Sequence, residues 1–282
     1  MVTSRSRRRR SRNACLLGLA ILAIACSPPQ AERISIWDAS DESNVEQIDH
    51  GRWQDLLDGY VSTDPSGVNV VDYAALAGNP ADAAILAGYL EFLQRIDPRD
   101  YARAEQMAYW INLYNALTVK VVLDAYPVDS IKEIHEGVVP LTGPWNDVHA
   151  NVAGEDLTLD HIEHGILRPI WRDKRIHYAV NCAAYGCPHL IRMVFTAANT
   201  ESLLERGARA YVNNPRGVDV VDDDFIVISS IYDWFAVDFG GTEEAVIEHL
   251  IDYADSELAA FLEAFDGAIE YDYDWKLNEP QR

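Results

Sequence analysis

The segment from Tyr101 to Ala125 constrains the fold most, because its apolar side chains recur at helical spacing over a long, unbroken stretch. A broad apolar stripe of this kind normally faces a protein core, so we expect a long helix around which the other elements pack. Pro127 ends the predicted helix, because proline cannot continue the backbone hydrogen-bond pattern. The stripe consists of Met107, Trp110, Ile111, Tyr114, Leu117, Val121 and Val122.

The rest of the chain reads as shorter helices and a few short strands. This mixture predicts a single, helix-rich α+β domain over residues 52–280. Further helices are expected over residues 52–61, 81–96, 160–169, 200–211, 230–237, 243–253 and 256–265. Strands are expected over residues 68–71, 148–152, 156–159, 175–180, 218–221 and 225–228.

The N-terminus has the pattern of a targeting segment rather than of a folded element. An arginine-rich head precedes a short apolar run, which ends in small residues directly before Cys26. We therefore expect a signal peptide over residues 1–25, lipidation of Cys26 and a polar tether over residues 26–51. The expected location is the bacterial cell envelope, with the protein anchored to the membrane by its lipid and facing the periplasm or the exterior.

The charge of the chain argues against nucleic acid as a partner. The formal net charge is −22, and loss of the six arginines in the basic head leaves about −28 on the mature chain. A surface of this sign repels phosphate backbones. The expected partner is therefore a small-molecule or peptide ligand, and no motif for a cofactor is present.

Two cysteines are the strongest candidates for chemistry. Of the four cysteines, Cys15 leaves with the signal and Cys26 carries lipid, so Cys182 and Cys187 are left as thiols or as a disulfide. Cys182 follows the predicted strand at residues 175–180, where site residues often lie. A cysteine nucleophile needs a lowered pKa, usually from an imidazole or a helix N-terminus.

The histidines offer two candidate bases for Cys182. His177 lies five positions before Cys182, and on a regular strand an odd spacing places two side chains on opposite faces. His164 comes from another element, so we prefer it as the base and keep His177 as the alternative. Glu163 and Asn181 are candidates for orienting the imidazole or an oxyanion.

The long helix supplies the candidate ligand-binding side chains. Asn112 and Asn115 share one face of it, and they could contact a ligand or hydrogen-bond to buried backbone groups. Trp110, Trp145 and Tyr232 are expected to line a binding groove together with these asparagines.

Five motifs in order resemble the bacterial branch of the family called domain of unknown function 547. They occur between about Trp53 and Asn278, and the resemblance implies no established activity or catalytic residue. Ala184 stands where many relatives have serine, so we assign that position no role. The motifs are AYWINLYNALTVKVVLDAYP, LTLDHIEHGILRP, RIHYAVNCAAYGCPHL, the segment SIYDWF with Asp238-Phe239, and YDWKLN.

The sequence leaves three functions open. The first is an envelope thiol-dependent hydrolase or acyl transferase, in which Cys182 attacks an amide or thioester and His164 takes its proton, by analogy with papain-like and transglutaminase-like folds. The second is a non-catalytic envelope binding protein with a Cys182–Cys187 disulfide. The third is a zinc site made by Cys182, Cys187, His177 and His164.

Overall fold

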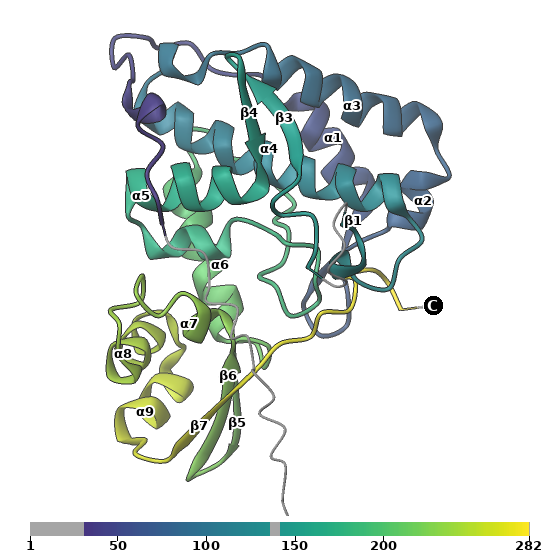
Figure 1. Cartoon of the computed structure of the whole chain (residues 1–282). Coiled ribbons are helices and arrows are strands. Elements are labelled where there is room, and N and C mark those ends of the chain that lie inside the picture. Colours follow the sequence, from purple (N-terminus) through teal and green to yellow (C-terminus); the bar gives the residue numbers. More distant parts are fainter. Residues whose placement is uncertain (1–30, 136–141, 282) are drawn as a thin grey trace, which may run out of the picture.

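The computed structural model describes residues 31–135 and 142–281, which form one α+β domain as the sequence predicts. The expected signal peptide and Cys26 lie outside these residues. Within the described ranges the strands form one three-stranded and two two-stranded sheets, and most of the chain between them is helical (Figure 1). No helix in these ranges is both long enough and apolar enough to cross a membrane.

Helix α4 (Arg103–Ala125) is the centre of the larger of two hydrophobic cores (Figure 1). Every side chain from Glu105 to Val119 is buried, so the helix is covered on all sides and not only along its apolar stripe. The elements around it are α1 (Gly51–Tyr60), β1 (Val61–Thr63), β2 (Asn69–Val71), α2 (Tyr73–Ala77), α3 (Pro80–Gln94), β3 (Val148–Val152) and β4 (Glu155–Thr158).

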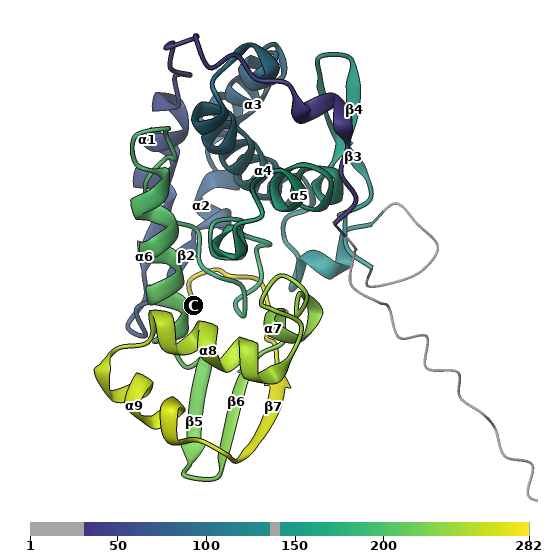
Figure 2. The ribbon, with the colours of Figure 1, turned by 90° about the vertical axis from the view of Figure 1, so that its left-hand side faces the viewer.

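A smaller core lies between a three-stranded sheet and the C-terminal helices (Figure 2). In this sheet β6 pairs antiparallel with β5 and parallel with β7. After β7 the chain runs back to the larger core, where its end lies near β1 (Figure 1). The elements of this part are α6 (Thr200–Val212), β5 (Val218–Asp222), β6 (Phe225–Ser229), α7 (Ile231–Trp234), α8 (Glu243–Tyr253), α9 (Ser256–Ala264) and β7 (Ala268–Asp272).

The strand expected at residues 175–180 is wrong, because the chain forms the 3-10 helix η5 (Lys174–Tyr178) there. The carboxylate of Asp173 accepts a hydrogen bond from the backbone N–H of Arg175 and also bonds to the guanidinium of Arg175. A side chain that bonds locally to the backbone favours a turn over an extended strand. The alternation of apolar residues therefore gave a wrong prediction here. Because there is no strand at these residues, the argument that His177 and Cys182 lie on opposite faces of a strand no longer applies.

The expected helix at residues 160–169 also takes an unusual form. It is a π-helix, η4 (His161–Leu167), which continues into α5 (Arg168–Trp171) through Pro169. Proline is tolerated at this point because it stands in the first turn of the α-helical part. Short π-helical turns are often found at functional sites, so this element is relevant to the site.

The segment expected to be a polar tether, residues 26–51, packs on the domain over the part that the structure describes. Trp37 and Ile48 are buried, and Ile34 packs against the larger core. The backbone N–H groups of Glu32 and Ile34 donate to carbonyl oxygens of the π-helix at 3.1 and 2.9 Å. Three apolar side chains among polar neighbours show no period, so the sequence pattern does not reveal this docking.

Candidate functional site

The two cysteines lie on a loop, residues 181–188, that is closed by the side chain of Asn181. Its amide donates to the carbonyl oxygen of Pro188 at 2.9 Å, and its carbonyl oxygen accepts from the N–H of Ala183 at 3.1 Å. Helix α4 holds the start of the loop, because Asn115 accepts from the backbone N–H of Asn181 at 2.8 Å. The loop is therefore fixed at both ends by buried asparagines.

The C-terminal segment holds the middle of the loop. The N–H of Tyr185 donates to the carbonyl oxygen of Lys276 at 2.7 Å, and the N–H of Gly186 donates to that of Asp274 at 2.8 Å. A Cβ atom at position 186 would lie 2.7 Å from the backbone N of Asp274, so only glycine permits this approach. The contact brings Tyr273 beside Cys182.

Hydrogen-bond donors converge on Sγ of Cys182, a residue that is partly exposed. The hydroxyl of Tyr273 lies 3.0 Å away, and the Cys187 thiol and the N–H of Ala184 also face the sulfur. The hydrogen bond from the Cys187 thiol, with those from Tyr273 and Ala184, outweighs burial and lowers the pKa of Cys182. Ala183, at φ +60°, sets the turn that aims the Ala184 N–H at the sulfur.

Cys187 differs from Cys182 in both its burial and its pKa shift. Its side chain is buried, and both cysteines are free thiols in the structure. Its Sγ accepts a hydrogen bond from the backbone N–H of Cys182 at 3.0 Å. Burial raises the pKa of Cys187 well above its ordinary value, and the neighbouring Cys182 raises it further. Of the two thiols, Cys182 is therefore the one that ionises first.

The predicted base, His164, is not paired with Cys182. Within the described residues neither His164 nor His177 hydrogen-bonds to this thiol, whose partners are Cys187, Ala184 and Tyr273. Both histidines belong instead to a buried charged cluster that joins the π-helix to the start of the smaller core. The members of the charged cluster are Glu163, His164, Arg168, His177 and Asp238.

The geometry of the charged cluster defines the state of each histidine. Arg168 donates to Nδ1 of His164 at 3.0 Å, so that nitrogen is an acceptor and the ring is neutral. His177 lies between two carboxylates, 2.8 Å from Asp238 and 3.6 Å from Glu163. Its ring stacks on Phe235 with a centroid separation of 4.3 Å.

The pKa shifts in the charged cluster agree with this geometry. Burial lowers the pKa of His164 to about 4, against the opposing effect of Glu163. Burial also works to lower the pKa of His177, but the hydrogen bonds to Asp238 and Glu163 outweigh it and raise the pKa. The pKa of Glu163 falls to about 2 although burial opposes this, because the neighbouring His164, His177 and Arg168 favour its charged form.

The predicted ligand-binding residues of α4 face the core instead. Asn112 bonds through both amide atoms to the backbone of Phe195, at 2.8 and 3.1 Å, and Asn115 bonds in the same way to Ala179 and Asn181. This is the structural alternative that the sequence left open. Trp110 and Tyr232 are fully buried, so neither lines a groove.

Trp145 belongs to a partly exposed group of rings beside the thiol. Trp275 stacks on Trp234 at 5.5 Å and meets Trp145 edge-on at 5.8 Å. Tyr273, the partner of Cys182, packs on Trp234 at 4.8 Å and on Trp275 at 4.7 Å. We call Trp145, Trp234, Tyr273 and Trp275 the aromatic cluster.

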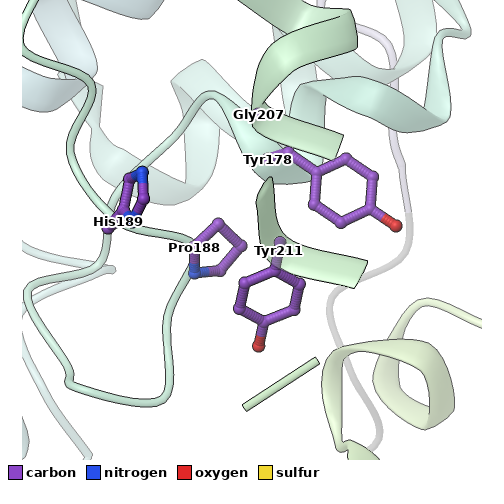
Figure 3. A pocket seen from close by; sticks show the side chains of 5 residues that line it. All are labelled: Tyr178, Pro188, His189, Gly207 and Tyr211. Carbon is purple, nitrogen blue, oxygen red and sulfur yellow. The ribbon is translucent and has the colours of Figure 1, made fainter. Parts of the chain in front are cut away.

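Two hollows lie in the described part of the chain, and Cys182 lines neither of them. A depression behind the loop is lined by Tyr178, Pro188, His189, Gly207 and Tyr211, and it has no room for a water molecule (Figure 3). A larger hollow of about 440 Å³ lies beside Arg168 and Asp238 at the outer side of the charged cluster.

The zinc alternative lacks its ligand set. Among residues 31–135 and 142–281, no group of three or more histidine, cysteine or acidic side chains is arranged to hold a metal ion. His164 and His177 bond within the charged cluster. The backbone N–H of Cys182 donates to Sγ of Cys187.

Sequence reasoning identified the cysteine loop but missed several of its partners. Tyr273 comes from a distant segment and occurs in a motif that carries the family resemblance. Asp238 occurs in another of these motifs, and it bonds to His177 in the charged cluster. Arg216 also contacts the loop, donating to the carbonyl oxygens of Tyr185 and Cys187 at 2.7 and 2.8 Å. No local pattern marks Arg216 as a site residue.

Fold and site together define an α+β protein with a polarised pair of thiols at the junction of its two cores. Residues 98–212 match the family described as "Protein of unknown function, DUF547", which confirms the predicted family. The narrower assignment to a bacterial branch stays a prediction. Comparison with curated proteins and with solved structures found no match, so the papain-like and transglutaminase-like analogy also stays a prediction.

Proposed function

We propose that this protein is a thiol enzyme of the cell envelope, in which Cys182 is the nucleophile for acyl transfer or hydrolysis at a thioester. The observation that carries the proposal is the convergence of three hydrogen-bond donors on Sγ of Cys182, in a residue that is partly exposed. Donors aimed at a sulfur stabilise its thiolate, and the thiolate is the nucleophilic form.

The reaction uses the same donors twice. The Cys182 thiolate attacks the acyl carbon, and the carbonyl electrons move onto oxygen to form a tetrahedral oxyanion. As charge leaves the sulfur, the Tyr273 hydroxyl and the Ala184 N–H become free to donate to that oxyanion. The oxyanion collapses, the thiolate of the substrate departs, and the acyl group stays on Cys182 until water or another acceptor removes it.

The surroundings of Cys182 favour a thioester over an amide. An amine leaving group must be protonated as it departs, and in cysteine hydrolases an imidazole supplies that proton. His164 and His177 are instead held in the charged cluster. A thiolate leaving group departs without a proton, so a thioester can react at a preformed thiolate with no imidazole beside it.

The aromatic cluster offers a surface for the substrate next to the nucleophile. Its rings are partly exposed, and Tyr273 belongs both to the cluster and to the donors around Cys182. Lys132 lies 4.7 Å from the ring centre of Trp275, which adds a positive charge to the surface. These features suit a substrate with an apolar or aromatic acyl group and a negatively charged portion.

The N-terminal sequence supports the envelope part of the proposal. The arginine-rich head, short apolar run and small residues before Cys26 favour a lipid anchor there. Glu32 already hydrogen-bonds to the domain, so at most about 20 Å of extended chain separates Cys26 from that point. A lipid on Cys26 would therefore hold the domain close to the membrane surface.

The test uses an aryl thioester such as S-phenyl thioacetate and the corresponding anilide as an amide control. The reduced protein should release thiophenol and carry an acetyl group on Cys182, detected by peptide mass spectrometry. Cys182→Ala should abolish both, and the anilide should be turned over far more slowly. Thioester cleavage that is undiminished in Cys182→Ala, or equal rates on thioester and anilide, would contradict the proposal.

A further inference from the structure

We propose a second activity for the cysteine loop, thiol–disulfide exchange, in which Cys182 attacks a disulfide in a protein or peptide and Cys187 resolves the mixed disulfide. This inference rests on the proposed function in one respect, because Cys182 is the attacking thiol in both. It adds a chemical role for Cys187, a residue that acyl transfer needs only as a hydrogen-bond donor, and it adds disulfides as a substrate class.

The position of the two sulfurs carries the inference. Sγ of Cys187 lies 3.0 Å from the backbone N of Cys182, and both residues are free thiols. Cys182 is partly exposed whereas Cys187 is 4% exposed. An external disulfide can therefore reach the first sulfur but not the second, which is the division of labour between an attacking and a resolving thiol.

The backbone of the loop is held in place by hydrogen bonds that a bridge between the two sulfurs would not break. Tyr211 donates to the carbonyl oxygen of Gly186 at 2.6 Å, and Arg216 donates to those of Tyr185 and Cys187 at 2.7 and 2.8 Å. Asn181 closes the loop across its ends. These bonds do not involve either sulfur, so they can persist in the reduced and the oxidised protein.

Electrostatics favours the same order of events. The pKa of Cys182 is lowered and that of Cys187 is raised, so Cys182 attacks first. Once Cys182 is in a mixed disulfide, its negative charge no longer opposes ionisation of Cys187. The guanidinium of Arg216, bonded to the Cys187 carbonyl oxygen, then favours the Cys187 thiolate.

The reaction is balanced in two steps. In the first, the Cys182 thiolate forms an S–S bond with one sulfur of the substrate, and the other substrate sulfur leaves as a thiolate. In the second, Cys187 loses its proton and attacks Sγ of Cys182, which expels the remaining substrate thiol. The protein is oxidised by two electrons to a Cys182–Cys187 disulfide, and the substrate is reduced to two thiols.

The experiment treats the reduced mature protein, in which Cys182 and Cys187 are the free thiols, with oxidised glutathione and follows the products by intact-protein and peptide mass spectrometry. The wild type should lose two hydrogens and keep no glutathione, with both cysteines in one bridge. Cys187→Ser, which retains a hydroxyl donor, should stop at a stable glutathione adduct on Cys182. Cys182→Ser should react at least about tenfold more slowly, because the buried Cys187 is then the only target in the loop.

Two results would overturn the inference. A wild type that accumulates the glutathione adduct on Cys182 with Cys187 still free would show that Cys187 does not resolve. Equal reaction rates for Cys182→Ser and the wild type would show that Cys182 does not attack first. Acetylation of Cys182 by S-phenyl thioacetate, measured on the same reduced wild-type sample, separates the two proposals. Acetylation without bridging rejects exchange alone, and absence of acetylation rejects the acyl-transfer proposal.

Discussion

The hydroxyl of Tyr273 lies 3.0 Å from Sγ of Cys182, although 91 residues separate them in the sequence. The contact exists because the chain after β7 runs back toward the larger core and bonds to the backbone of the cysteine loop (Figure 1). Burial raises the pKa of Tyr273 well above its ordinary value, so the hydroxyl keeps its proton. It can therefore donate to Sγ of Cys182 and stabilise the charged form of this thiol.

Replacing Tyr273 with phenylalanine should make Cys182 less reactive. A hydrogen bond to a charged group contributes about 1.5–3 kcal/mol, and partial exposure of the sulfur favours the lower value. The rate of alkylation by iodoacetamide at pH 6 should fall by about tenfold, and the pH midpoint of the reaction should rise. Tyr271→Phe is the matched control, because its hydroxyl faces Glu243 at 3.4 Å instead. Identical alkylation profiles for Tyr273→Phe and the wild type would remove the hydroxyl from the site.

Two asparagines on α4 allow a separation of stability from reactivity. Asn112→Ala and Asn115→Ala each leave a buried backbone N–H and C=O without their partner. At about 1–3 kcal/mol for each group, both variants should lose roughly 2–6 kcal/mol of unfolding free energy in urea. Only Asn115→Ala should slow alkylation of Cys182, because only Asn115 holds the cysteine loop. Equal alkylation rates in the two variants would argue against that role.

The parts of the fold that were predicted correctly are those specified by local sequence. Helix α4 has a long apolar period, and the hairpins β3–β4 and β5–β6 have strands joined by short turns. Strand β7 was missed, since it is an edge strand whose pairing with β6 depends on contacts distant in sequence. The wrong strand at residues 175–180 has a specific cause, because Asp173 caps a 3-10 turn where alternation suggested extension.

In the candidate site, too, the relations between residues close in sequence were predictable and those between distant residues were not. Cys182, Cys187 and Asn181 lie within one loop, and their relation follows from proximity along the chain. The pairing with His164 could not be judged, because the sequence does not show that Arg168 and Asp160 already engage this ring. Buried Trp110 was assigned to a groove because an apolar aromatic residue in a core and one in a binding surface look alike in sequence.

Stability should fall when the pH drops below about 6.5, because several buried histidines are neutral in the folded protein. Burial lowers their pKa values, whereas in the unfolded chain each titrates near 6.5. Between pH 6.5 and pH 4 the unfolded state therefore binds more protons, and stability decreases as pH falls. The histidines are His50, His164 and His189, with pKa values of about 4, and His249, with a pKa of about 3.

Asp160 and His177 have the opposite effect on stability, because each stabilises the folded protein at low pH. Burial, reinforced by Glu163, raises the pKa of Asp160 to about 6, so its contribution is present at low pH and is lost as pH rises toward 6. The raised pKa of His177 stabilises the protein below pH 6.5, and this contribution is lost as pH rises through the folded pKa. Near pH 5 the net effect is about three protons, or roughly 4 kcal/mol per pH unit.

Urea unfolding at several pH values between 4.5 and 7.5 measures this slope. His249→Phe keeps a ring against Tyr178 but cannot be protonated, so it should reduce the slope by about one proton. Near neutral pH its unfolding free energy should be lower than that of the wild type, because Tyr178 loses a hydrogen-bond partner at 2.6 Å, and this difference should shrink as the pH falls. A flat dependence of wild-type stability across this range would show that these histidines are accessible to protons in the folded state.

The anchor at Cys26 can be tested independently of the thiol chemistry. Cys26→Ser should remove the lipid and release the protein into the soluble fraction, because no acyl chain would then bind the protein to the membrane. Cys15→Ser is the matched control, since Cys15 lies inside the expected signal and its loss should leave the protein with the membranes. Mass spectrometry of the N-terminal peptide should show the acyl chains on Cys26 in the wild type. Unmodified Cys26, or a Cys26→Ser protein that still carries lipid and sediments with membranes, would reject the lipoprotein assignment.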